Sequence, residues 1–315
     1  VSAYVSSLVN RYSRAVQESN QTVSIVVPVF NEQEVLPSFL AELSALLDSL
    51  RSRGLSTEVI FNDNGSSDGS VLILREFQHA GSLIRRNEFA RNYGFQESIL
   101  YGIKCASGDC VVVLQSDLQD PPGLVLDMVS QWQSGCLTVA GRPRTRDERR
   151  GMRFLRGLYY AATAVGSGAK EAKGILDFYL LDRVVVKEIE QTPYSGAFLR
   201  GRIAQTFGFQ SVIDYDRARR PSGHTKFGAS DLYEIGMSGL LLQSRRYIRF
   251  LALLGLAIAI LSGLGLLLIG LLWLVGVRTS LSGWFSLTSI LLVILGVNSV
   301  GFALVFEYLS RLSGV

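Results

Sequence analysis

Two long runs without an ionisable side chain constrain this sequence more than any other feature. They cover 28 residues from Phe250 to Val277 and 26 residues from Leu281 to Phe306. About 20 apolar residues in a helix cross a bilayer, so both runs are long enough to span one. Because a backbone in lipid must satisfy its own hydrogen bonds, we expect two transmembrane helices. A helical hairpin buried inside a large soluble core is the alternative.

Charges around these runs predict how the chain is oriented. Only Arg278-Thr279-Ser280 separates the runs, so we expect an antiparallel hairpin whose ends return to one side. Arg245, Arg246 and Arg249 precede the first run, and Arg311 follows the second. The positive-inside rule then places the long N-terminal part in the cytoplasm of a multi-pass inner-membrane protein.

Four segments are expected in total. They are an N-terminal amphipathic helix, an α/β domain, a juxtamembrane amphipathic helix and the transmembrane hairpin, at residues 1–22, 23–228, 229–247 and 248–312. The first segment lacks the long apolar stretch of a signal peptide. Its apolar stripe is expected to pack on its own domain or on a second subunit, which leaves a homo-oligomer possible, and contact with a membrane surface is the alternative. Three cysteines without metal-ligand spacing indicate a reducing compartment rather than a disulfide framework.

Apolar strand-like segments alternate with helical ones up to about residue 140. Strands are expected at 23–29, 58–61, 82–84, 110–114 and 137–140, with helices at 32–50 and 93–106 between them. This order predicts a parallel sheet covered on both faces. Ligands of such sheets bind at the carboxyl ends of the strands. Neither GxGxxG nor GxxxxGK[ST] occurs, which argues against a dinucleotide enzyme and a P-loop ATPase.

Polar residues follow the expected strands. Asp117 and Gln119 supply hard oxygen ligands after the strand ending at Leu114, which suits Mg²⁺ or Mn²⁺ held together with substrate phosphates. Asp120 precedes two prolines and is expected to be a helix N-cap. Asp63 either binds a base or ribose, or is a turn residue before Gly65.

Several motifs in order resemble a known family. They are Val27-Pro28-Val29-Phe30-Asn31-Glu32, Asp63-Asn64-Gly65-Ser66-Ser67-Asp68, Arg91-Asn92-Tyr93-Gly94, Asp117-Leu118-Gln119-Asp120-Pro121-Pro122, Asp177-Phe178, Phe198-Leu199-Arg200-Gly201 and Arg220-Pro221-Ser222-Gly223-His224-Thr225-Lys226-Phe227. Together they resemble glycosyltransferase family 2 and, within it, the polyprenyl-phosphate glycosyltransferases. The resemblance implies a GT-A fold, Rossmann-like with a mostly parallel sheet, followed by two C-terminal transmembrane helices.

The resemblance also implies residue roles. Pro28, Phe30, Glu32 and Asp63 would surround the nucleotide base and ribose. Asp117 and Gln119 would hold the metal, Mg²⁺ or Mn²⁺, and the diphosphate. Asp117, Arg220 and Lys226 would carry catalysis, the last two by reaching phosphate oxygens.

Two positions depart from the family pattern. The family often has Asp-Asp-Gly-Ser where this chain has Asp63-Asn64-Gly65-Ser66, and Asp-x-Asp where it has Gln115-Ser116-Asp117. The second change leaves fewer carboxylates for the metal, so metal affinity depends more on the nucleotide.

Arginines are concentrated between residues 142 and 156, where seven stand against two acidic residues. Arginine suits phosphate because its fork is always charged and bidentate. Most of these residues are expected to contact lipid headgroups or solvent. Arg142 and Arg153 occupy family positions that imply contact with the acceptor phosphate. The apolar runs and sugar-diphosphate motifs argue against nucleic-acid binding.

The implied reaction is inverting transfer of a hexose to polyprenyl phosphate. Glucose from UDP-glucose and undecaprenyl phosphate are the favoured donor and acceptor. GDP-mannose, UDP-GlcNAc or a modified arabinose are alternative donors. A non-catalytic membrane scaffold that binds nucleotide sugars is the alternative outside enzymes.

Overall fold

The structure is a computed structural model that describes residues 21–144, 174–191, 199–218, 245–276 and 282–312. The chain divides into two compact units, Val1–Gly239 and Leu240–Val315, which are described separately. The predicted N-terminal helix lies outside the described residues except for positions 21 and 22. Most of the predicted juxtamembrane helix, residues 229–244, also lies outside them.

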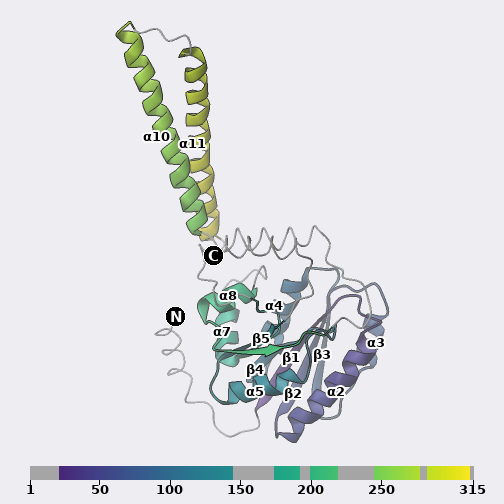
Figure 1. Cartoon of the computed structure of the whole chain (residues 1–315). Helices are drawn as coiled ribbons and strands as arrows, with labels where there is room; N and C mark the ends of the chain where they lie inside the picture. Colours follow the sequence, from purple (N-terminus) through teal and green to yellow (C-terminus); the bar gives the residue numbers. More distant parts are fainter. Residues whose placement is uncertain (1–20, 145–173, 192–198, 219–244, 277–281, 313–315) are drawn as a thin grey trace. The chain divides into compact units, whose positions relative to one another are not determined.

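In its described residues the first unit is built on a mixed sheet of seven strands (Figure 1). In chain order these are β1 (Thr22–Val29), β2 (Ser56–Asp63), β3 (Ser82–Glu88), β4 (Cys110–Val113), β5 (Thr138–Pro143), β6 (Tyr179–Asp182) and β7 (Ser211–Tyr215). Their order in the sheet is β3-β2-β1-β4-β6-β5-β7. Among the described strands only β6 runs antiparallel to its neighbours β4 and β5. The predicted, mostly parallel α/β sheet is therefore confirmed.

Helices cover both faces of this sheet, as the alternating sequence predicts. They are α2 (Leu36–Ser52), α3 (Ser70–Glu76), α4 (Phe95–Cys105), α5 (Leu124–Gln133), α7 (Arg183–Gln191) and α8 (Leu199–Thr206). One apolar core joins β1 and β2 to α2 and α5, and the other joins them to α4, α7 and α8. Within β1, Ile25 faces the first core and Val26 the second, which is the period of two expected for a strand buried on both sides.

Two predicted element boundaries differ most from the structure. The first helix begins at Leu36 rather than at residue 32, because the carbonyl of Glu32 closes a turn by accepting hydrogen bonds from Val35 and Leu36. Strand β3 runs to Glu88, well beyond residue 84. As an edge strand it pairs with β2 alone and carries charged residues, so its sequence does not form an apolar run.

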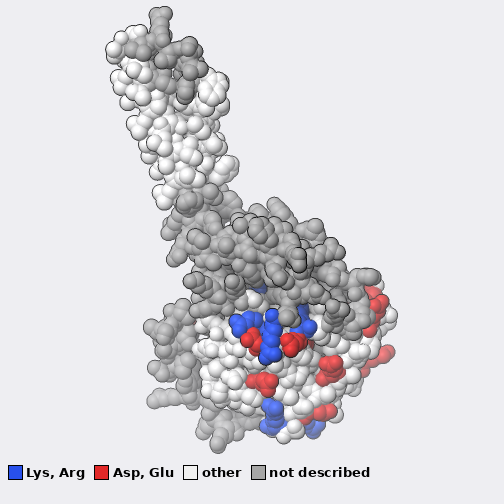
Figure 2. Space-filling view, viewed as in Figure 1, with Lys and Arg blue, Asp and Glu red and all other residues white. Residues whose placement is uncertain are grey.

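The second unit consists of two packed helices, α10 (Arg245–Leu274) and α11 (Ser282–Leu312). Their backbones approach closely at Gly255 and Gly296, where an added Cβ on Gly296 would lie 2.5 Å from the Gly255 carbonyl oxygen. Small residues at a crossing are typical of helix pairs in membranes. The described surface of this pair carries no charged side chain in the view of Figure 2.

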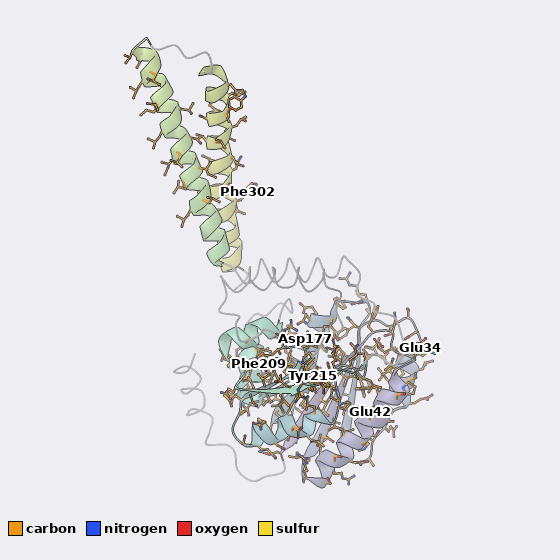
Figure 3. The ribbon with its side chains drawn as sticks, viewed as in Figure 1. Glu34, Glu42, Asp177, Phe209, Tyr215 and Phe302 are labelled. Atoms are coloured by element: carbon orange, nitrogen blue, oxygen red, sulfur yellow. The ribbon has the colours of Figure 1, made fainter. Side chains whose placement is uncertain are left out.

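One segment of this pair meets the requirements of a membrane span within the described residues. It is Ala252–Leu272, with 21 residues and a mean hydropathy of 2.6. The apolar segment in α11 is shorter, Leu287–Phe302. Phe302, labelled in Figure 3, is 68% exposed on α11. One of the two predicted spans is thus matched by length and composition, and the second remains a prediction.

Candidate functional site

Six of the predicted site residues lie at one edge of the sheet. Strands β2, β1 and β4 are parallel neighbours, so their carboxyl ends lie side by side. Pro28 is in β1, and Phe30 and Glu32 follow it. The remaining three are Asp63 at the end of β2 and Asp117 and Gln119 after β4.

The segments leaving β1 and β2 are joined by reciprocal hydrogen bonds. The Asn31 amide donates to the Ser66 hydroxyl at 2.8 Å, and the Ser67 amide donates to Asn31 Oδ1 at 2.7 Å. Asn31 adopts a left-handed conformation with φ 53°, which asparagine tolerates better than most residues. The Glu32 amide donates to the Ser70 hydroxyl at 2.8 Å. These bonds fix the predicted nucleotide-binding residues Phe30 and Glu32 beside Asp63.

Asp63 has the turn role, one of the two that the sequence left open, and ligand binding stays a prediction. Its Oδ2 accepts a hydrogen bond from the Ser66 amide at 3.0 Å, which is the turn role. Its Oδ1 is buried and has no hydrogen-bond partner in the described part of the chain. A buried acceptor without a partner is costly unless a ligand satisfies it. Asp63 therefore has an oxygen available for a polar ligand.

The motif that begins with Asp63 packs tightly against residues 91–94. Gly65 has φ 76°, and a Cβ there would lie 2.7 Å from the Arg91 carbonyl carbon. Asn64 donates from Nδ2 to Asn92 Oδ1 at 2.8 Å and accepts from the Tyr93 amide at 2.9 Å. An aspartate, the residue more common in the family, would lack that donor. Asn64 thus has a structural role that accounts for an asparagine at the position where the family often has aspartate.

The turn after β4 presents the predicted metal ligands. Leu118 has φ 57°, and the Gln119 amide donates to Asp117 Oδ1 at 3.1 Å. In the described residues no three His, Cys, Asp or Glu side chains converge as a metal site. One carboxylate with an amide oxygen still fits a divalent ion that takes its other ligands from phosphates and water. The donor set is therefore compatible with Mg²⁺ or Mn²⁺.

Asp120 does not cap a helix, so that prediction is wrong. Helix α5 begins at Leu124 after Gly123 and has no side-chain cap. Asp120 is fully buried; its Oδ1 accepts a hydrogen bond from the Tyr215 hydroxyl and lies 3.3 Å from Arg217 Nε. Burial raises the pKa of Asp120, while Arg217 and Tyr215 act in the opposite direction. Asp117 and Asp177 raise the pKa of Asp120 further.

Asp177 joins three elements at the same edge. It precedes β6, and its Oδ2 accepts from Gln96 Nε2 of α4 at 3.1 Å and pairs with Arg200 of α8 at 3.3 Å. Its Oδ1 is buried without a hydrogen-bond partner in the described residues. Asp177 and Tyr215 lie in the same region of the domain in Figure 3. The sequence placed Asp177 and Arg200 in family motifs but gave neither a role, because nothing along the chain shows that they meet.

The predicted acceptor-binding residues are only partly described. Arg142 lies in β5, is about half exposed, and forms two bonds to Asp214 of β7, 2.6 and 3.0 Å long. This pairing lowers the pKa of Asp214. Basic and acidic side chains also lie next to one another on the face shown in Figure 2. Arg153, Arg220 and Lys226 lie outside the described residues.

Proteins of bacteria and of a phage are similar to this chain over most of its length. "Uncharacterized glycosyltransferase YkcC" of Bacillus subtilis (strain 168) is 29% identical over 92% of this chain and 88% of its own. "Prophage bactoprenol glucosyl transferase homolog" of Escherichia coli (strain K12) is 28% identical over 92% of this chain and 94% of its own. "Bactoprenol glucosyl transferase" of Shigella phage SfV is 29% identical, with coverages of 92% and 94%.

A solved structure has a similar fold. Glucosyl-3-phosphoglycerate synthase from Mycobacterium tuberculosis, in complex with Mn²⁺, UDP and glucosyl-3-phosphoglycerate, has a TM-score of 0.51 and 19% identity. The match covers 75% of this chain and 81% of that one. The family description "Glycosyl transferase family 2" matches residues 24–199. Since this match spans more than half of the chain, the protein is a glycosyltransferase that belongs to glycosyl transferase family 2.

Proposed function

We propose that this enzyme transfers glucose from UDP-glucose to a polyprenyl phosphate such as undecaprenyl phosphate, with inversion at the anomeric carbon. One observation carries the proposal: the chain that presents Asp63, Asp117 and Gln119 at one sheet edge also contains the 21-residue apolar segment Ala252–Leu272. A sugar-diphosphate site attached to a membrane helix suits a lipid acceptor. The relatives named bactoprenol glucosyl transferase support the same donor sugar and acceptor.

The nucleotide lies against Pro28, Phe30, Glu32 and Asp63 in this proposal. The unpartnered Oδ1 of Asp63 accepts a hydrogen bond from the base or ribose. Asp117 and Gln119 hold the diphosphate end of the donor together with Mg²⁺ or Mn²⁺. When bound, the divalent ion neutralises charge on the leaving diphosphate.

The acceptor phosphate is held by Arg142 and Arg153. Arg142 already positions its guanidinium through Asp214, so its remaining N–H groups are oriented for an anion. Arg220 and Lys226 bind phosphate oxygens. An acceptor phosphate is an anion near neutral pH, so its attack on the anomeric carbon depends on positioning and charge stabilisation rather than on a strong base.

The apolar helices anchor the enzyme in the inner membrane. Arg245, Arg246, Arg249 and Arg311 flank them on one side, which supports a cytoplasmic catalytic domain. Residues 248–312 form the membrane hairpin, 229–247 an interfacial helix and 1–22 an N-terminal helix in this proposal. The lipid headgroup then meets the donor site at the cytoplasmic surface.

The test uses purified full-length protein with undecaprenyl phosphate and a panel of nucleotide sugars, with and without Mn²⁺ or Mg²⁺. The mass of the lipid product identifies the sugar. We expect glucose from UDP-glucose and loss of activity when the metal is removed. A product from GDP-mannose, UDP-GlcNAc or a modified arabinose donor would replace the glucose assignment, and no product at all would favour a scaffold.

The role of Asp117 is tested by Asp117→Asn in the same assay. We expect at least a hundredfold loss of turnover, the size typical for removal of a charge-stabilising group. Asp127→Asn is the matched control, since Asp127 is exposed on α5. Near-normal turnover in Asp117→Asn would contradict the metal role.

A further inference from the structure

The turn after β4 is attached to a strand that is not its neighbour. Strands β6 and β5 separate β4 from β7 in the sheet. Tyr215, the last residue of β7, nevertheless donates its hydroxyl to Asp120, 95 residues earlier in the chain. Arg217 Nε lies 3.3 Å from the same Asp120 oxygen, and the Ala218 amide donates to the Gln119 carbonyl at 3.1 Å. We call these three contacts the β7 clamp.

The Tyr215 ring reaches Asp120 across the intervening strands. Its centroid is 5.9 Å from that of Phe178 in an edge-to-face arrangement. A Cβ on Gly141 of β5 would lie 3.0 Å from Tyr215 Cε1 and 2.8 Å from Phe178 Cδ1. Only a glycine at position 141 therefore leaves room for the ring in this position. The packing against Phe178 and Gly141 therefore fixes the ring where its hydroxyl reaches Asp120.

The clamp supplements the one hydrogen bond within the turn described above, from the Gln119 amide to Asp117 Oδ1. Leu118, between Asp117 and Gln119, has φ 57°, a conformation that is costly for a leucine. Such a conformation persists only when surrounding contacts fix it. The described contacts that fix the end of this turn come from Tyr215, Arg217 and Ala218. Asp120 is fully buried, so its carboxylate requires these partners.

We propose that Tyr215 and Arg217 are positioning residues that act through Asp120 to hold Asp117 and Gln119 in the geometry that binds the metal and the diphosphate. This inference rests on the proposed function for the role of Asp117. The clamp itself exists without ligand, so it can be measured separately.

Tyr215→Phe is the test variant, because it removes the hydroxyl and keeps the ring. Asp120→Ala is avoided, since leaving Arg217 without its partner could prevent folding. Tyr101→Phe is the control, because Tyr101 is 47% exposed on α4 and its hydroxyl is not part of the clamp. Arg217→Gln removes the ion pair, and Arg217→Lys restores a cation.

The first measurement is amide hydrogen exchange of residues 115–120 in the full-length protein without metal or nucleotide. We expect exchange about tenfold faster in Tyr215→Phe and Arg217→Gln, partial recovery in Arg217→Lys, and no change in Tyr101→Phe. The second is the Mn²⁺ concentration for half-maximal sugar transfer. We expect it to rise about tenfold, with a fall in kcat and little change in KM for the nucleotide sugar.

Unchanged exchange in both variants would overturn the clamp. Faster exchange with an unchanged Mn²⁺ requirement and kcat would overturn its positioning role. Failure of the proposed function gives a different result whatever the exchange rates are: the unmodified protein forms no lipid-linked sugar, or Asp117→Asn keeps full activity.

Discussion

At the scale of single residues, burial and hydrogen bonding distinguish side chains that look alike in the sequence. Asp63, Asp117 and Asp120 all follow strands, yet they have different partners. Asp63 and Asp117 accept from amides two or three residues later, and within the described residues Asp63 Oδ1 has no hydrogen-bond partner. Asp120 instead accepts from Tyr215 and lies beside Arg217. Because these two partners lie far along the chain, local spacing could not identify Asp120 as a structural carboxylate.

Asn64→Asp tests the bridge between residues 63–68 and 91–94. The aspartate still accepts from the Tyr93 amide, but it loses the donation to Asn92 and brings its carboxylate next to an amide oxygen. We expect a loss of about 1–2 kcal/mol in the free energy of unfolding, because Asn64 is buried. Denaturant titration of both proteins measures this difference in the free energy of unfolding. Unchanged stability would show that the family's usual aspartate fits equally well here.

Cys110 is expected to be unreactive in the folded enzyme. It is fully buried in β4, and burial raises the pKa of its thiol, so little thiolate forms near pH 8. We expect a thiol reagent to label at most Cys105 and Cys136, which are partly exposed, and to label a third site only after denaturation. Counting added labels by mass checks this. Rapid labelling of all three sites under native conditions would contradict it.

At the scale of elements, the sequence predicted what depends on local pattern. The buried strands β1, β2 and β4 are apolar runs, and they lie where the pattern placed them. Strand β3 was underestimated because an edge strand tolerates charges. Strands β6 and β7 were not predicted, because runs of four and five residues are ambiguous between strand and helix. The sheet order that brings Asp177 near Asp120 depends on long-range pairing, which no local window contains.

The contact of α4 with the sheet is tested by Gly102→Ala. A Cβ there would lie 2.3 Å from Val26 Cγ1 and 2.5 Å from Asn62 Nδ2, both in the buried core. We expect a loss of about 1–3 kcal/mol, because overpacking outweighs the better helix propensity of alanine. Gly123→Ala is the control, since nothing lies within 4 Å of its added Cβ. Thermal unfolding of both variants provides the comparison, and equal midpoints would contradict the close packing.

At the scale of the whole molecule, two units of different composition share one chain. Residues up to Gly239 contain both apolar cores and the candidate site, and the unit from Leu240 contains the apolar helices. Many large apolar side chains of the helix pair are exposed, including Phe302, which Figure 3 labels. In water such a surface would favour aggregation, whereas in a bilayer it is the surface that lipid contacts.

Removing residues 240–315 tests whether the first unit binds the nucleotide without the apolar helices and whether those helices are needed for transfer to a lipid acceptor. The proposed UDP site lies at the carboxyl ends of the strands in the first unit, so we expect the shortened chain to bind UDP with an affinity within about threefold of the full chain. Transfer to undecaprenyl phosphate in vesicles should fall by about tenfold or more, because the tether that raises the local concentration of enzyme at the lipid surface is absent.

A water-soluble, short-chain polyprenyl phosphate separates tethering from catalysis in this experiment. With that acceptor in solution no tether is needed, so the shortened and full chains should transfer sugar at similar rates. Co-sedimentation with vesicles measures the loss of membrane binding directly. If the shortened and full chains transferred sugar to the acceptor in vesicles at equal rates, the apolar helices would have no role in presenting the lipid. If it lost activity on the soluble acceptor as well, those helices would form part of the acceptor site itself.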